Sequence, residues 1–371
     1  MIIVIADDVT GAAEMAGVAL RNNLKVQFVT EVDNRLPETD ILVIATDTRS
    51  MSREEAVETM KHIAGYLKEN KDIRVFKKTD SVMRGHIMPE LETLAACMGY
   101  EKTILLPQNP SKGRIIKGGT YYIDGVLLDK TSFSYDPEFP ATSARVEQIA
   151  KAGVSMPLGG QPQHGKVNIG DASGMAELAM QVDKADNKTL VAGGADTFNI
   201  LLRKLGISGK GQHAGSNAIN SGKTLVLCGS TQSKSLIDMP YFKKMKSVEE
   251  GMPLDVFHGN PADEWIASLQ QSYTDNEALI IKIGHKAVGG KEYAIRLRGM
   301  MSAVAHRLIS SQKPLLLIIE GGATAFAVLK ELGWNVFDVK KELSPGVVCL
   351  SYDSTDIILK PGSYPWGGLF E

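Results

Sequence analysis

Two neighbouring carboxylates stand where the first apolar run of the chain meets a helical pattern. The run Ile2–Ala6 ends at Asp7 and Asp8, and Thr10, Gly11 and a stretch rich in alanine follow. A single aspartate is enough to cap a helix, because its side chain accepts a backbone N–H and complements the helix dipole. Since capping does not need two, we expect one of them to accept hydrogen bonds from substrate hydroxyls or to act as a general base.

A second cluster, KKTDSVMRGH, follows another apolar run. It combines Lys78, Asp80, Ser81 and Arg84 within a few residues and ends at His86. The arginine could bind a carboxylate through two parallel hydrogen bonds. A solvated loop before a capped helix is the alternative interpretation, and a histidine at the start of a helix is more often structural.

A third polar turn, PQNPSKGR, follows the apolar run at 103–106. Asn109, Ser111, Lys112 and Arg114 could bind a polar ligand, whereas the two prolines could equally make this a stiff turn. The residues alone leave both interpretations open.

The second half of the chain has glycine-rich turns directly after apolar runs. The sequence GST at 229–231 follows one run, and GGAT at 321–324 follows another run that ends in Glu320. Backbone N–H groups at the start of a helix bind phosphate, so both turns could hold a nucleotide without a Walker A motif. Close packing of a helix on a strand is the alternative. Lys360 and Gly362 form another turn near the end of the chain.

These side chains need a scaffold, and short apolar runs alternate with amphipathic helical patterns along most of the chain. The runs predict buried strands at Ile2–Ala6, Val26–Thr30, Ile41–Ala45, Arg74–Phe76, Thr103–Leu106, Lys166–Ile169, Thr189–Ala192, Thr224–Cys228, Leu279–Ile283 and Pro314–Ile319. Ser52 and Glu55 form a capping box at the start of one helix. Strand, helix and strand in this order indicate parallel βαβ units, in which ligands bind at the carboxyl ends of the strands.

Two segments interrupt the alternation. The stretch 113–165 is rich in Gly, Pro, Ser and Thr, which predicts a long surface excursion, that is, an irregular segment on the surface, beside a site or an interface. Gly206–Lys223 is rich in Gly and Ser and is the best candidate for a linker. We therefore predict two α/β domains, at residues 1–215 and 222–371, each a mostly parallel sheet flanked by helices.

Composition excludes several classes of protein. The chain has 371 residues and a formal net charge of −2, which argues against a polyanion partner such as nucleic acid. Its three cysteines are scattered without metal-ligand spacing, which suits a reducing compartment. No apolar run approaches the length of a membrane span, and the N-terminal run is too short for a signal peptide. We expect a soluble, cytoplasmic protein.

In this order, the motifs resemble those of the four-carbon acid sugar kinase family over nearly the whole chain. ADDVTGA is similar to the family's ADDLTGA, and KTDSVMRGH is similar to KTDSTLRGN. The GS turn, GGATA and LKPGSY are looser matches. Three positions depart from the family: Ala323 stands where an acidic residue is usual, the GS turn reads GSTQS, and His86 replaces an asparagine.

The resemblance implies an enzyme that uses ATP and Mg²⁺ to phosphorylate the terminal hydroxyl of a tetronate such as threonate, erythronate or a 3-oxo form. It implies a sugar-acid-binding N-terminal domain, a nucleotide-binding C-terminal domain and an active site in the interdomain cleft. The implied catalytic residues are Asp7, Asp8 and Asp80. The implied substrate-binding residues are Lys78, Asp80, Ser81, Arg84 and Asn109. The implied nucleotide-binding residues are Ser230, Gly321, Gly322, Ala323, Thr324 and Gly362.

The sequence leaves an alternative function open. Ala323 in the GGAT turn fits a sugar-acid-binding protein that derives from such a kinase and transfers phosphate weakly or not at all. A dehydrogenase is disfavoured, because no GxGxxG motif follows the first strand. The expected partners are a small sugar acid and ATP, with a homodimer as a further expectation.

Overall fold

The chain folds into two compact units, Met1–Gly211 and Gln212–Glu371. The structure is a computed structural model, and it describes every residue except 34, 71, 137, 210–221, 231–232, 286–289, 363–365 and 371. Most of the predicted linker lies outside the described residues. The domain limits 1–215 and 222–371 therefore stay a prediction.

The first unit is built on a parallel sheet with the strand order β2-β3-β1-β4-β11-β5-β10-β9. Its strands are β1 (Ile2–Ala6), β2 (Val26–Val29), β3 (Ile41–Ala45), β4 (Arg74–Lys78), β5 (Lys102–Leu106), β9 (Val154–Met156), β10 (Val167–Gly170) and β11 (Thr189–Gly193). Its helices are α1 (Val9–Arg21), α2 (Arg53–Leu67), α3 (Ile87–Met98), α4 (Val146–Ile149), α5 (Met175–Asp183) and α6 (Ala195–Lys204).

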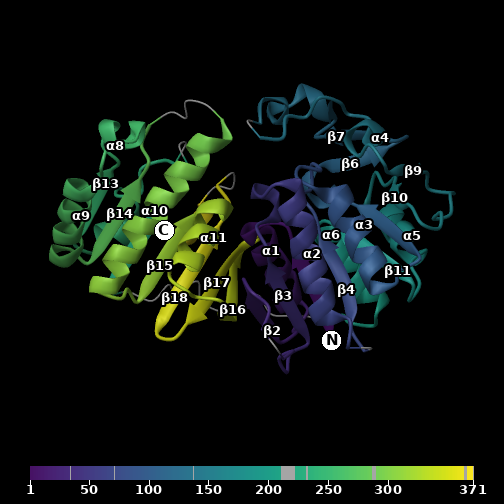
Figure 1. Cartoon of the computed structure of the whole chain (residues 1–371), viewed down its shortest axis with the longest axis horizontal. Coiled ribbons are helices and arrows are strands. Elements are labelled where there is room, and N and C mark those ends of the chain that lie inside the picture. Colours follow the sequence, from purple (N-terminus) through teal and green to yellow (C-terminus); the bar gives the residue numbers. More distant parts are fainter. Residues whose placement is uncertain are drawn as a thin grey trace. The chain divides into compact units, whose positions relative to one another are not determined.

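Helices cover both faces of this sheet (Figure 1). Helices α2 and α3 pack together on one face, whereas α1, α5 and α6 pack on the other. Side chains of a strand alternate between the two faces. Ile3 and Ile5 of β1 accordingly share a buried cluster with Met60 of α2 and Leu91 of α3. The predicted capping box is present at the start of α2, where Ser52 and the side chain three residues later bond each other's backbone N–H groups.

The predicted excursion at 113–165 has more structure than its composition suggested. It contains a small antiparallel sheet of β6 (Arg114–Lys117), β7 (Thr120–Ile123) and β8 (Val126–Leu127). It also supplies β9, which pairs with β10 at the edge of the main sheet. Short strands joined by glycine turns bury few side chains and therefore leave little hydrophobic periodicity in the sequence. We call the small sheet and the 3₁₀ turns that follow it, residues 114–135, the flap.

The second unit has a sheet with the order β13-β14-β12-β15-β18-β17-β16. Strands β12 (Thr224–Cys228), β13 (Ser247–Gly251), β14 (Ala278–Lys282), β15 (Leu316–Glu320) and β18 (Thr355–Lys360) are parallel. Strands β16 (Val336–Ser344) and β17 (Val347–Tyr352) continue the sheet in antiparallel pairing. The helices are α7 (Pro240–Lys243), α8 (Leu254–His258), α9 (Asp263–Asp275), α10 (Lys291–Ser311) and α11 (Gly322–Glu331).

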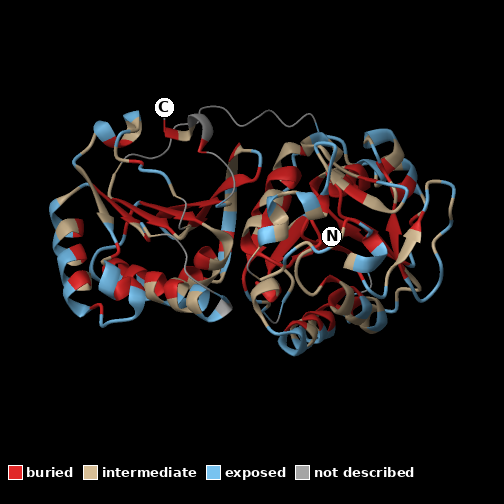
Figure 2. Cartoon of the chain, turned by 90° about the horizontal axis from the view of Figure 1, so that it is seen from above, coloured by how far each residue is buried: buried red, intermediate tan, exposed pale blue. Residues whose placement is uncertain are grey.

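In each unit the central strands of the main sheet are the most deeply buried elements, whereas β13 and β16 are partly exposed (Figure 2). In the second unit, α10 contacts both α9 and α11 over one face of the sheet. The other face packs against Phe242 of α7 and against Trp366 and Phe370 of the C-terminal turn. Two sheets of mostly parallel strands flanked by helices confirm the predicted fold class. Within the described residues, no helix combines the length and the apolar character that a bilayer span requires.

Candidate functional site

Asp7 and Asp8 follow β1 at the carboxyl edge of the first sheet, as predicted, and their roles in the fold differ. Asp8 caps α1, because its Oδ1 accepts a hydrogen bond from the N–H of Gly11 at 2.8 Å. Its Oδ2 accepts a hydrogen bond from the Thr10 hydroxyl at 2.7 Å. Asp7 does not cap the helix, yet its carboxylate is buried, with 3% of the residue exposed. A buried carboxylate needs a partner, and capping does not provide one for Asp7.

That partner is Arg49, which sequence reasoning missed. Its Nε and Nη2 each lie 2.8 Å from Oδ2 of Asp7, and its Nη1 lies 3.2 Å from Oδ2 of Asp8. The same Nη1 lies 3.5 Å from Oδ2 of Asp80. One half-buried guanidinium thus gathers all three aspartates that were predicted to be catalytic. We call these four residues the Arg49 cluster.

A signal for Arg49 was present in the sequence. The residue lies in a 3₁₀ turn, Thr48–Ser50, directly after β3. Strand β3 is the parallel neighbour of β1, so their carboxyl ends lie side by side. The rule that directed attention to the polar turns after β1 and β4 applies equally to the TDTRS turn after β3.

Arg84 is bound to two carboxylates. Its Nε and Nη2 donate to Asp80 at 3.2 and 2.8 Å, and its Nη1 donates to Asp136 at 3.0 Å. The ring of Phe133 lies 5.5 Å from the guanidinium carbon. All three guanidinium nitrogens of Arg84 therefore have a carboxylate partner.

The flap contacts the turn between Asp80 and Arg84 at Ser81. The Tyr121 hydroxyl donates to the Ser81 backbone oxygen, and Nη1 of Arg114 donates to the Ser81 hydroxyl. The guanidinium carbon of Arg114 lies 5.7 Å from the centre of the same Phe133 ring. The flap thereby brings a second arginine next to Arg84.

Two lysines meet the carboxylate of Glu14 in α1. Lys112 Nζ lies 2.6 Å from Oε1 of Glu14, and Lys78 Nζ lies 3.7 Å from Oε2. Asn109, predicted to bind substrate, is 2% exposed, and its Oδ1 accepts a hydrogen bond from the N–H of Asp196 at the start of α6. The turn after β5 is therefore docked onto helices of the first unit, which supports the stiff-turn interpretation, and ligand binding by this turn stays a prediction.

Lys77 precedes Lys78 in β4, so its side chain points to the opposite face of the sheet. Lys77 Nζ lies 2.6 Å from Oε2 of Glu90 in α3, and both side chains are almost completely buried. Burial raises the pKa of Glu90, in spite of the positive charge of Lys77. His86 precedes α3, and its Nε2 lies 2.9 Å from the backbone oxygen of Met51, which fits the structural role expected of it.

Two carboxyl groups of the Arg49 cluster, those of Asp8 and Asp80, have lowered pKa values. Burial alone would raise the pKa of Asp8, but Arg49 and Lys78 outweigh it and hold this pKa below its ordinary value. For Asp80, burial is outweighed by Arg49 and Arg84, and its pKa lies far below the usual range. Both groups are therefore ionised at neutral pH and are weak proton acceptors.

In the second unit, the predicted nucleotide-binding turns meet at the carboxyl edge of the sheet. Strands β12, β15 and β18 are parallel neighbours, with Cys228 paired to Glu320 and Glu320 to Lys360. The three turns that follow these strands therefore lie next to one another. The structure thus places the Ser230 turn, the 321–324 turn and the Gly362 turn together, while Thr231 lies outside the described residues.

Two glycines, Gly229 and Gly321, explain why the turns after β12 and β15 can approach so closely. A Cβ added to Gly229 would lie 2.0 Å from Thr324 Oγ1 and 2.9 Å from the backbone oxygen of Glu320. Gly321 has a φ of +104°, a conformation that other residues rarely adopt. A Cβ on Gly362 would lie 3.6 Å from Ser230 Cβ. Helix α11 begins directly after Gly321, so its first N–H groups stand at this edge, and N–H groups at the start of a helix are a common binding site for phosphate.

The fit for Mg²⁺ is poorer. Glu320 is 3% exposed, its Oε1 lies 2.7 Å from Lys360 Nζ, and its Oε2 accepts a hydrogen bond from Ser233. Ala323 adds no carboxylate to the first turn of α11. Among the described residues, no group of three or more His, Cys, Asp or Glu side chains could hold a metal ion. The described side chains thus do not form a magnesium site of their own.

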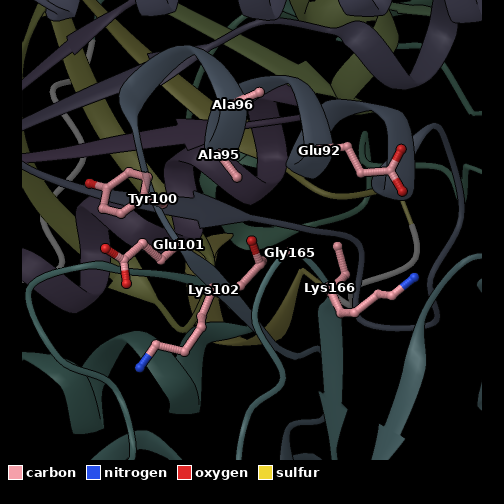
Figure 3. Close-up of a pocket in the computed structure, with 10 residues that line it drawn as sticks. Glu92, Ala95, Ala96, Tyr100, Glu101, Lys102, Gly165 and Lys166 are labelled. Atoms are coloured by element: carbon pink, nitrogen blue, oxygen red, sulfur yellow. The ribbon is translucent and has the colours of Figure 1, made fainter.

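A cavity of about 200 Å³ in the first unit lies apart from these clusters. It is bounded by the end of α3 and the beginnings of β5 and β10, with Glu92, Tyr100, Lys102 and Lys166 in its wall (Figure 3). The amino ends of parallel strands form this edge, opposite to the edge that carries the Arg49 cluster. Ligands of such sheets bind at the carboxyl edge, so this cavity is no part of the predicted site.

The chain is thus an α/β protein of two units. The first unit carries a cluster of charged side chains at the carboxyl edge of its sheet, and the second carries glycine-rich turns at the same edge of its own sheet. Residues 2–197 match the family model described as a sugar-binding N-terminal domain. Residues 247–364 match the model described as a nucleotide-binding C-terminal domain. The chain belongs to the four-carbon acid sugar kinase family, a family of phosphotransferases.

Individual relatives agree with this family. The chain is 26% identical to a 3-oxo-tetronate kinase of Haemophilus influenzae, over 100% of this chain and 98% of the relative. It is 29% identical to a D-erythronate kinase of Heliobacterium modesticaldum, over 41% of this chain and 36% of the relative. A crystal structure of a Salmonella typhimurium protein matches with a TM-score of 0.76 and 20% identity, covering 100% of this chain and 97% of that one. At this identity, the crystal structure supports the fold alone.

Proposed function

We propose that the chain is an ATP-dependent kinase that phosphorylates the terminal hydroxyl of a four-carbon sugar acid. The observation that carries the proposal is the Arg49 cluster, which gathers three carboxylates at the carboxyl edge of the sheet, within the segment that matches the sugar-binding domain. Carboxylates in such a group accept hydrogen bonds from the hydroxyls of a polyol. The names of the relatives favour 3-oxo-tetronate and D-erythronate as substrates, with threonate as a further member of the class.

In this proposal the aspartates have different tasks. Asp8 and Asp80 orient the substrate hydroxyls, because their lowered pKa values make them weak bases. Asp7 is the candidate for accepting the proton of the attacking hydroxyl, because its Oδ1 is buried and has no hydrogen-bond partner among the described residues. Phosphoryl transfer depends mainly on positioning and charge neutralisation, so the demand on this base is small. Lys78, Ser81, Arg84 and Asn109 complete the acid site.

The nucleotide site is proposed at the three turns of the second unit. Ser230, Gly321, Gly322, Ala323, Thr324 and Gly362 would surround the phosphates of ATP. Lys360 is buried against Glu320 and would add a positive charge behind these turns. Because the described residues offer no magnesium site, Mg²⁺ would be held chiefly by the phosphates themselves. The expectation of one site shared by both units stays a prediction.

The test is a coupled assay of ADP release with a panel of four-carbon acids: 3-oxo-tetronate, D-erythronate and the threonates, each with Mg·ATP. We expect ADP release that depends on one or a few of these acids. ADP release that is the same without any acid would contradict the proposal.

A sugar-acid-binding protein without turnover remains the second candidate. Ala323 and the pairing of Glu320 with Lys360 and Ser233 favour it, because both remove a carboxylate that could help to hold Mg²⁺. Calorimetry separates the candidates. A kinase binds both Mg·ATP and the acid, whereas the binding protein binds the acid and releases no ADP.

A further inference from the structure

The cations around the acid site differ in the partners that neutralise them. Arg49 is neutralised by the three aspartates of its cluster, and Arg84 by Asp80 and Asp136. Lys78 and Lys112 share the carboxylate of Glu14. A cation whose charge is already balanced by carboxylates gains less from binding a further carboxylate than a cation without such partners.

Arg114 is the exception among the cations that reach this turn. Within the described part of the chain, no carboxylate lies within ion-pair distance of its guanidinium, whose contacts are the Ser81 hydroxyl and the Phe133 ring. The side chain is half-buried, and its backbone is held in the flap by pairing with Ile123 and with Asn109. A guanidinium whose neighbour is an aromatic ring keeps N–H groups available for hydrogen bonds.

We propose that Arg114 binds the carboxylate of the substrate, and that Arg84 is a positioning residue that acts through Asp80. This inference rests on the proposed function and deepens it. A carboxylate is the group that a planar guanidinium fork recognises best. The Ser81 hydroxyl, which Arg114 contacts, lies next to Asp80 in the chain. The carboxylate end of the acid would therefore lie at the flap, and its hydroxyl groups would extend toward the Arg49 cluster.

The sequence favoured Arg84 for this contact because it lies in KTDSVMRGH, a polar turn after a strand and a match to a family motif. The structure gives the opposite preference, since each of the three nitrogens of the Arg84 guanidinium already donates to a carboxylate. Arg84 and Arg114 both contact the ring of Phe133, so removal of either side chain changes the packing around the other. An experiment must therefore distinguish loss of charge recognition from loss of structure.

The experiment compares D-erythronate with erythritol, a probe with the same chain of four carbons but no carboxylate. Their affinities for the full chain are measured by calorimetry, and kcat and KM are measured for D-erythronate. For Arg114→Gln we expect the affinity for D-erythronate to fall by roughly 10- to 100-fold, as is typical of a lost hydrogen-bonded charge contact. The affinity for erythritol should change by less than about threefold, and most of the kinetic loss should appear in KM.

The ratio of the two affinities is measured within each variant, so it does not depend on the folded fraction. Arg114→Lys keeps the charge and should retain part of the preference for the acid. Arg84→Gln should weaken both probes alike, because it acts through the aspartate that orients hydroxyl groups. Arg145→Gln, an exposed arginine held by Gly118 and Thr120, is the matched control and should change neither affinity.

An unchanged ratio in Arg114→Gln, or a ratio that falls in Arg84→Gln instead, would overturn the inference. Failure of the proposed function looks different: the wild-type chain would release no acid-dependent ADP with any acid of the panel. A wild-type chain that turns over an acid but bound D-erythronate no better than erythritol would also contradict the role of Arg114.

Discussion

At the scale of single residues, the site is governed by the balance of charge around Arg49. Asp7, Asp8 and Asp80 are buried and all lie within ion-pair distance of Arg49. Their negative charges repel one another, and the positive charge of Arg49 offsets this repulsion. The two aspartates after β1 and the aspartate after β4 could be predicted as a group from their place at strand ends. Their common partner was missed, because the TDTRS turn carries a single arginine among small polar residues and looks like an ordinary loop.

The same balance predicts how stability depends on pH. Asp8 and Asp80 have pKa values in the folded chain below the ordinary value of 3.8. Their ion pairs therefore stabilise the fold above about pH 4, and this contribution is lost as the pH falls through the lowered values. Arg49→Gln should lower the free energy of unfolding by about 3 kcal/mol near neutral pH, because it leaves buried charges without their partner.

This loss should shrink in acid. Without Arg49, the aspartates are easier to protonate in the folded chain, and protonation removes their repulsion. Urea unfolding of the wild type and Arg49→Gln at about pH 7 and about pH 4 measures the difference. Arg53→Gln, which changes an exposed arginine at the start of α2, serves as the control. A difference between wild type and Arg49→Gln that stays constant with pH would show that charge pairing is not the cause.

At the scale of elements, the parallel strands could be predicted and the irregular segment could not. Strands such as β1, β3 and β12 are continuous apolar runs because both of their faces are buried, and this pattern is unambiguous. The flap has alternating, half-exposed residues joined by glycine turns, which composition describes as a loop. The hairpin of β16 and β17 was missed for a similar reason, since β16 carries charged residues along an exposed face.

The close contact between the turns after β12 and β15 predicts that a side chain at Gly229 disturbs nucleotide binding. In Gly229→Ala, the new methyl group would meet Thr324 Oγ1 and the backbone oxygen of Glu320, so the turns after β12 and β15 must move apart. We expect the affinity for Mg·ATP to fall by about tenfold or more, while binding of the acid is retained. Calorimetry with each ligand measures both effects.

Gly299→Ala is the matched control in the same unit. A Cβ at this exposed position of α10 meets nothing within 4 Å, and alanine favours a helix over glycine. This variant should bind Mg·ATP as the wild type does. Equal loss of affinity in both variants would show that the β12 turn has no special part in nucleotide binding.

At the scale of the whole molecule, the sequence predicted the fold class and the family, because both depend on features spread along the chain. Alternating strands and helices fix the architecture, and motifs near both ends match one family in one order. What the sequence could not predict is how charges pair across the turns of the first unit. That pairing depends on which side chains of separate strands point to the same face, and it changes the expected role of Arg84.

The central claim is that the chain transfers phosphate from ATP to the terminal hydroxyl of a four-carbon acid. ³¹P NMR of the full chain with Mg·ATP and the most active acid of the panel tests this claim directly. Phosphate on a terminal CH₂–O group is split into a triplet by two protons, whereas phosphate on an internal CH–O group gives a doublet. The account predicts a triplet that grows in step with ADP, and a doublet, or inorganic phosphate as the sole new signal, would contradict it.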